Sequence, residues 1–90
     1  MPAPDREFLP MLVTVRLLAS YRQYLPEDHD HTASFFREVE PGTRVKDLLT
    51  ELPLPRGDAR TFIVNGRHAR EDQVLQEGDT LAVFPAVGGG

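Results

Sequence analysis

The chain has 90 residues, a formal net charge of −4, and an ordinary globular composition of 40% hydrophobic and 27% charged residues, so we expect one folded domain. The acidic balance argues against a nucleic-acid partner, and the lack of cysteine excludes a disulfide, a thiolate nucleophile and a thiolate zinc site. No run is long enough to span a membrane, and the first ten residues lack the pattern of a signal peptide, so we expect a cytoplasmic protein without a membrane partner.

The first half of the chain predicts a flexible arm followed by a hairpin. Residues 1–10 carry three prolines and are expected to form a loose N-terminal arm. The sequence MLVTVRLL at 11–18 alternates apolar and polar side chains, which predicts a half-buried strand. Residues 19–31 are polar and acidic and predict a loop. Residues 32–39 are rich in strand formers and are expected to return antiparallel to the first strand.

A change of period marks the one predicted helix. Four apolar side chains fall at the i, i+3, i+4 and i+7 positions of a helical stripe: Val45, Leu48, Leu49 and Leu52. Thr43 is the predicted N-cap, and prolines 53 and 55 are expected to end the helix.

Two more strands complete the predicted fold. Residues 60–64 and 80–84 read as strands, and Asn65-Gly66 is a strong tight-turn signal. The polar segment between the two strands is interpreted as a connection anchored by Val74 and Leu75. The order strand, strand, helix, strand, strand predicts an α+β domain at 11–85, with one main helix across one face of a mixed sheet. Residues 86–90 are then a flexible tail.

Candidate catalytic clusters are weak in this sequence. The acidic loop EDHDH at 27–31 contains potential metal ligands, but two histidines without a distant third ligand favour a solvated loop, so we predict no metal site. His68 follows a turn and is interpreted as a surface residue. Phe35 and Phe36 are adjacent, so one is expected in the core and the other on the surface. No spacing suggests a catalytic triad or carboxylate pair, and an enzyme is not expected.

The glycine-rich end of the sequence, FPAVGGG, carries the most specific chemistry. Pro85 cannot donate a ladder hydrogen bond, and glycines lack a Cβ, so Gly88, Gly89 and Gly90 could thread a narrow channel. A terminal carboxylate, with a pKa of about 3.3–3.7, is anionic and a poor electrophile at neutral pH. It would need activation, for example by transfer of AMP from ATP, before a sulfur nucleophile could attack it.

Four segments in order resemble the MoaD/ThiS sulfur-carrier family, which has the ubiquitin-like β-grasp fold with a mixed four- to five-stranded sheet. They are MLVTVRLLASYRQYLP, VEPGTRVKDLLTEL, FIVNGR and EGDTLAVFPAVGGG. The resemblance covers nearly all of 11–90. It implies that Gly90 is adenylated by an E1-like enzyme using ATP and becomes a thiocarboxylate, with Gly88 and Gly89 threading and no stably bound cofactor. The chain would then be a carrier, as in the non-catalytic small subunit of molybdopterin synthase.

The same resemblance implies a partner interface beside the tail. Its candidate residues are Phe84, Pro85, Val87 and Arg22, and the partners are the adenylating enzyme and the molybdopterin synthase large subunit or an equivalent sulfur acceptor. The F-P-x-V-x-G-G ending favours molybdenum or tungsten cofactor synthesis. The alternatives are a carrier for thiamine or another sulfur-containing metabolite, a ubiquitin-like protein modifier, and a non-covalent interaction module.

Overall fold

The computed structural model describes residues 10–86 of the chain, which form one mixed sheet and two short helices. The elements in chain order are β1 (Met11–Leu17), the 3-10 helix η2 (Ala19–Tyr24), β2 (Ser34–Val39), α1 (Val45–Leu49), β3 (Arg60–Val64), β4 (Arg67–Ala69) and β5 (Thr80–Pro85).

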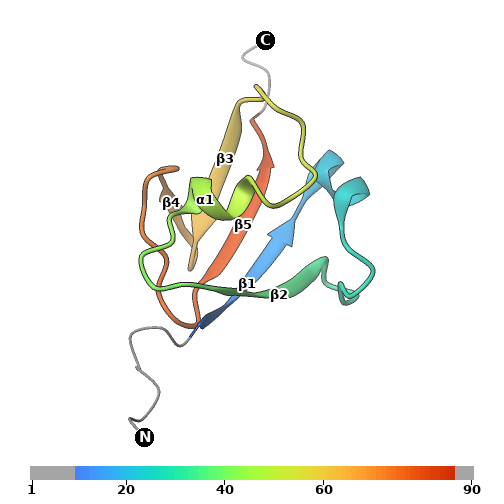
Figure 1. Cartoon of the computed structure of the whole chain (residues 1–90). Coiled ribbons are helices and arrows are strands. Elements are labelled where there is room, and N and C mark those ends of the chain that lie inside the picture. The colour runs from blue at the N-terminus through green and yellow to red at the C-terminus, as the bar shows by residue number, and fades with distance from the viewer. Residues whose placement is uncertain (1–9, 87–90) are drawn as a thin grey trace, which may run out of the picture.

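The five strands lie in the order β2-β1-β5-β3-β4. The central strands β1 and β5 run parallel, and every other pair is antiparallel. The helix α1 lies across one face of this sheet (Figure 1). The predicted α+β architecture, with a mixed sheet and one main helix across one face, is therefore confirmed, and so is the antiparallel return of β2 onto β1.

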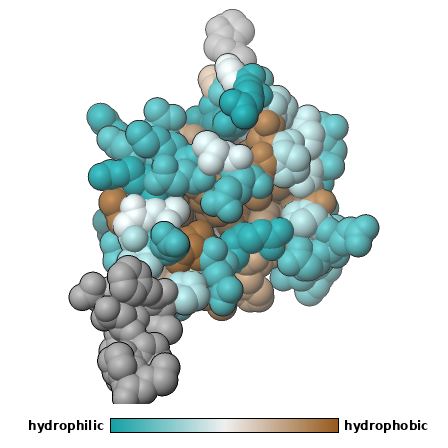
Figure 2. All heavy atoms as spheres, in the orientation of Figure 1, coloured by the Kyte–Doolittle hydropathy of each residue, from teal (hydrophilic) through white to brown (hydrophobic). Residues whose placement is uncertain are grey.

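The core lies between α1 and the sheet, and alternation along the strands supplies it. Val15 is opposite Phe35 on one side and Leu81 on the other, so all three side chains point to the helix face. The fully buried or nearly buried members of the core are Val13, Val15, Leu17, Tyr21, Phe35, Val39, Val45, Leu48, Leu49, Val64, Leu75, Leu81 and Val83. On the outside of the α1 face, hydrophilic side chains cover most of the surface (Figure 2).

The structure separates the two adjacent phenylalanines of β2 as predicted. The Phe35 side chain is 2% exposed in the core, whereas Phe36 is 62% exposed on the other face of the sheet. We refer to that second face, which α1 does not cover, as the open face of the sheet.

Three local predictions were wrong. Residues 19–24, predicted as loop, form η2, in which the buried Tyr21 packs into the core. Thr43 is not the N-cap: Arg44 holds that position, and its backbone N–H donates to the Asp47 carboxylate at 2.9 Å. The Thr43 hydroxyl instead donates to the carbonyl of Glu40.

The third difference is β4, which was interpreted as part of a connection. The Asn65-Gly66 turn was predicted, and both residues have positive φ angles of 52° and 83°, as a tight hairpin turn requires. The chain after this turn pairs with β3 through Arg67, opposite Val64, and Ala69, opposite Phe62.

Candidate partner interface at the end of β5

The carboxyl end of β5 is held by β3 up to the last described residue. Phe84 is opposite Thr61, and Pro85 is opposite Arg60. The backbone N–H of Ala86 then donates to the carbonyl of Ala59 at 3.0 Å. Pairing with β3 therefore fixes the position of the chain up to Ala86, the point that we call the chain exit.

A polar cluster braces this exit point on the helix side of the sheet. The Arg60 Nε donates to the Tyr21 hydroxyl at 3.1 Å, and that hydroxyl lies 3.3 Å from the Asp58 Oδ2, to which it donates. The Arg60 guanidinium also donates through Nη2 to the carbonyl of Pro55 and lies over the Tyr21 ring, 5.7 Å from its centroid. We call Tyr21, Asp58 and Arg60 the exit cluster. It ties η2 and the segment before β3 to the end of β5.

The sequence reasoning missed the exit cluster. Its three residues come from η2, a loop and the first position of β3, and no motif joins positions so far apart in the chain. A buried tyrosine needs a partner for its hydroxyl, but the sequence alone does not say which group supplies it.

On the open face, Phe84 has apolar neighbours from two strands. Phe84 and Thr61 are a cross-strand pair, and the next pair on the same face along these strands is Ala82 with Ile63. All four side chains are partly exposed. Arg16 follows in that row beside Ala82, with its guanidinium donating to the carbonyl of Thr32 at 3.1 Å. The result is a small apolar patch beside the chain exit, bordered by a cation.

The other predicted contact residues are Arg22, Pro85 and Val87. Arg22 is exposed on η2, which follows β1 and packs against β5. Since β1 and β5 are parallel, η2 and the carboxyl end of β5 lie at the same end of the molecule (Figure 1). Pro85 is half-buried opposite Arg60. Val87 and the glycines at 88–90 lie outside the described residues.

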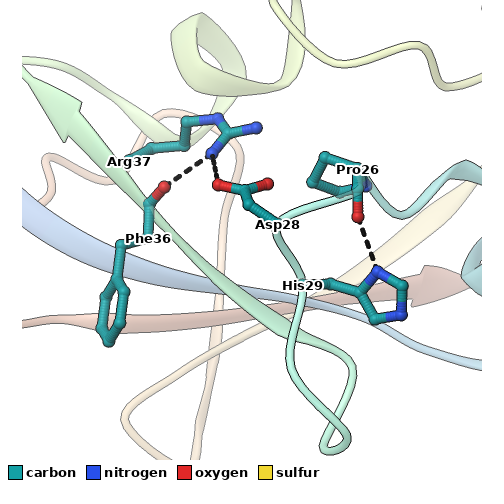
Figure 3. Close-up of polar contacts among 5 residues, drawn as sticks. All are labelled: Pro26, Asp28, His29, Phe36 and Arg37. Carbon is teal, nitrogen blue, oxygen red and sulfur yellow. Dashed lines mark hydrogen bonds and ion pairs between the residues drawn. The ribbon is translucent and has the colours of Figure 1, made fainter.

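The acidic loop at 27–31 is used for local contacts. Asp28 Oδ2 lies 3.1 Å from the Arg37 Nη1, and His29 Nδ1 lies 2.6 Å from the carbonyl of Pro26 (Figure 3). Asp30 Oδ1 accepts hydrogen bonds from the backbone N–H groups of Thr32 and Ser34. Within residues 10–86, no group of three His, Asp or Glu side chains could hold a metal ion.

One further property concerns membranes. No helix in the described part of the chain is long and apolar enough to cross a bilayer.

Comparison with known proteins defines the class. The HVO 2177 protein of Haloferax volcanii has a TM-score of 0.71 at 22% identity, with 100% of this chain and 94% of that chain covered. A protein of Pyrococcus furiosus, named as a candidate molybdopterin converting factor subunit 1, gives 0.68 at 26%, covering 86% and 99%. The small archaeal modifier protein 1 of Methanosarcina acetivorans gives 0.62 at 21%, covering 90% and 98%. No curated protein matches the sequence significantly.

The five-stranded mixed sheet with its crossing helix, shared with these structures, makes the chain a ubiquitin-like β-grasp protein, as the sequence resemblance implied. Its sequence matches the ThiS family over residues 15–90, so the chain belongs to that family. It is therefore a small carrier protein of the ubiquitin-fold sulfur-carrier family, and not an enzyme.

Proposed function

We propose that the protein carries sulfur as a thiocarboxylate on Gly90, in the glycine-rich segment that follows the central strand β5. One observation supports this above the others. The family match continues through Gly90, while the pairing of β5 holds the domain only up to Ala86. The four residues after Ala86, 87–90, can span at most about 13–14 Å when extended, at ~3.3–3.6 Å each. The folded domain is then the part that partners bind, and Gly90 is the reactive group.

The chemistry requires three steps: an activating enzyme supplies the first two, and a thiol reductant supplies the third. The Gly90 carboxylate attacks the α-phosphorus of ATP and releases pyrophosphate, which leaves an acyl-adenylate. A persulfide sulfur of the enzyme then attacks the acyl carbon and displaces AMP. Reductive cleavage of the resulting acyl disulfide by a thiol leaves the thiocarboxylate. ATP is thus a substrate of the activating enzyme, and this carrier needs no resident cofactor.

The acceptor that we propose is a precursor of the molybdenum or tungsten cofactor. The Pyrococcus furiosus neighbour is named for molybdopterin conversion, and the F-P-x-V-x-G-G ending favours the same pathway. The partners would be an E1-like adenylating enzyme and a molybdopterin synthase large subunit in the cytoplasm. Phe84 and Pro85 would contact them beside the chain exit, together with Val87 and Arg22. A thiamine-type or other sulfur acceptor is the alternative within the same chemistry.

A second candidate function is protein modification. The Methanosarcina acetivorans neighbour is a small archaeal modifier protein, and a modifier would use the same adenylation. The Gly90 acyl group would then pass to a lysine amine of another protein instead of to sulfur. Lys46, on the exposed side of α1, is the single lysine of the 90-residue sequence. A chain of modifier molecules joined through lysine would therefore have to be linked at Lys46.

Intact-mass analysis separates these functions. The purified protein is incubated with its activating enzyme, ATP and a sulfur donor. The carrier gains the mass of one oxygen replaced by sulfur, and deletion of Gly90 abolishes the gain. Conjugates with lysines of other proteins would support the modifier. No mass change with an enzyme that consumes ATP in its presence would contradict both and leave a non-covalent interaction module.

A further inference from the structure

The strand β2 forms one edge of the sheet, and its outward backbone groups are those of alternate residues. The carbonyl of Ala33 accepts from the N–H of Leu17 in β1, so the odd-numbered residues of this segment face β1. The even-numbered residues Ser34, Phe36 and Glu38 therefore direct their N–H and C=O groups away from the sheet. An exposed edge of this kind is a template for pairing with another strand.

The acidic loop and Arg37 occupy part of this edge. The Ser34 carbonyl accepts from the backbone N–H of Asp30 at 2.8 Å, and the Ser34 N–H donates to the Asp30 Oδ1 at 3.1 Å. The Arg37 Nη1 donates to the carbonyl of Phe36 at 2.7 Å and to the Asp28 Oδ2 at 3.1 Å. Figure 3 shows the Arg37 guanidinium between the Phe36 carbonyl and the Asp28 carboxylate. Three outward groups of β2 are thus engaged within the chain. We call Asp28, Asp30 and Arg37 the edge guard.

The two edges of the sheet are protected in different ways. At the other edge, β4 has only three residues, and short edge strands offer little to a partner. The six residues of β2 make a longer template, and the exposed Phe36 ring stands beside it. The edge guard lies on the longer of the two edges, where protection matters more.

We propose that the edge guard keeps the protein monomeric by covering the outward edge of β2. Without the guard, this edge would pair with β2 of a second copy. This inference does not depend on the sulfur chemistry. Removing the guard would allow two β2 strands to pair antiparallel and join two five-stranded sheets into one.

The register of that pairing follows from the sequence of β2. With a two-fold axis at Phe36, the two Phe36 residues exchange N–H and C=O bonds, and Ser34 lies opposite Glu38 of the second copy. On the core side, Phe35 lies opposite Arg37 of the second copy, the combination that Phe35 and Arg37 already form within one chain at 4.6 Å. No like charges stand opposite one another, and the two exposed rings meet at the axis. The strand is therefore complementary to itself.

Sedimentation velocity tests the proposal on the full chain. We expect the wild type to remain monomeric. The variant Asp30→Ala/Arg37→Met frees the Ser34 N–H and the Phe36 carbonyl and should dimerise with a dissociation constant lower by about ten-fold or more. Adding Phe36→Glu to that variant places like charges at the axis and should restore the monomer. The control variant Glu27→Ala/Arg70→Met makes the same charge changes at exposed sites outside the edge guard and should stay monomeric.

Disulfide trapping tests the register, because the chain has no cysteine of its own. We call Asp30→Ala/Arg37→Met the unguarded variant. When Phe36→Cys is added to it, the two copies of position 36 should cross-link under oxidation, because the Cα atoms of a hydrogen-bonded pair lie about 5.5 Å apart, within the range of a disulfide. Ser34→Cys should not cross-link, because in this register the two Ser34 residues are about 13 Å apart.

Three results would overturn the proposal: a folded unguarded variant that stays monomeric, a dimer that Phe36→Glu leaves intact, or cross-linking through position 34 instead of 36. If the double variant does not fold, the single variant Arg37→Met, which keeps the packing of the side-chain stem, must show a smaller shift toward self-association, because it frees the Phe36 carbonyl while Asp30 still engages Ser34. A folded Arg37→Met protein with wild-type sedimentation would equally contradict the guard.

Discussion

The N–H of Ala86 donates to the carbonyl of Ala59 at 3.0 Å, which extends the pairing of β5 with β3 to the end of the described chain. Ala86 is therefore a fixed point on the domain, from which the reach of Gly90 is measured. If Gly90 must reach an active site in a partner, the number of residues after Ala86 decides whether it arrives.

Shortening that segment should therefore impair sulfur loading without affecting the fold. Deleting Gly88 removes about 3.3–3.6 Å of reach but keeps a diglycine end. We expect thiocarboxylate formation to slow by about a hundred-fold, since an ångström-scale misplacement of a reacting group has that effect. The rate is measured by intact mass after incubation with the activating enzyme. Deletion of Ala3 in the N-terminal arm is the control, and equal rates for both deletions would show that reach is not limiting.

The Phe84 patch should contribute to partner binding. Phe84→Ala removes a partly exposed aromatic ring beside the chain exit, and we expect the affinity for the activating enzyme to fall by about ten-fold or more, as for a hot-spot aromatic. Calorimetric titration of enzyme with carrier measures this loss. Phe36→Ala is the matched control, because that ring is on the same face but away from the exit. A similar loss for both variants would mean that the contact is not centred on Phe84.

The exit cluster should stabilise the domain through the Tyr21 hydroxyl. Tyr21→Phe keeps the ring but removes the acceptor of Arg60 and the donor to Asp58, so we expect a loss of about 1–2 kcal/mol in the free energy of unfolding. Urea denaturation gives the value. Tyr24→Phe serves as the comparison, because Tyr24 is on the same short helix but is only half-buried, and it should change stability by less than about 0.5 kcal/mol.

The adjacent phenylalanines of β2 provide a direct test of the core. Phe35→Ala should cost about 3–5 kcal/mol of unfolding free energy, because it empties a site that is 2% exposed. Phe36→Ala, at 62% exposure, should cost less than about 0.5 kcal/mol. Chemical denaturation of both variants gives the comparison, and equal costs would mean that the strand is turned over relative to this structure.

The acidic loop should contribute stability that depends on pH. Hydrogen bonds from the Thr32 hydroxyl and backbone N–H lower the pKa of Asp30, so its carboxylate is bonded more strongly in the folded state. That stabilisation is complete above the unfolded pKa of about 3.9 and is lost as the pH falls through the lower folded pKa. Asp30→Ala should therefore lower the melting temperature at pH 7, and the difference from the wild type should shrink below about pH 4. A difference that grows in acid would contradict this assignment.

The strands with a clear apolar pattern were predictable from the sequence. Residues 60–64 were predicted as a strand, and β3 has those bounds, because alternation and a flanking turn signal specify both the element and its ends. The facing of Phe35 and Phe36 could only be stated as one in and one out. Which of them is buried depends on the register with β1, where Phe35 meets Val15.

The misses have a physical cause in common. The strand β4 is three residues long and mostly exposed, so it carries no alternation, and only pairing with β3 makes it a strand. The helix η2 is fixed by the burial of Tyr21, and the exit cluster by contacts between distant segments. Each depends on the tertiary structure, to which a single sequence gives no direct access.

The position of β5 between β1 and β3 has a mechanical consequence. A partner that draws the end of the chain into a channel applies tension along β5, which is bonded to a neighbour on each side. The load acts in shear along both ladders, so many hydrogen bonds resist together instead of opening one at a time. The domain can therefore withstand a pulling force on its last residues without unfolding.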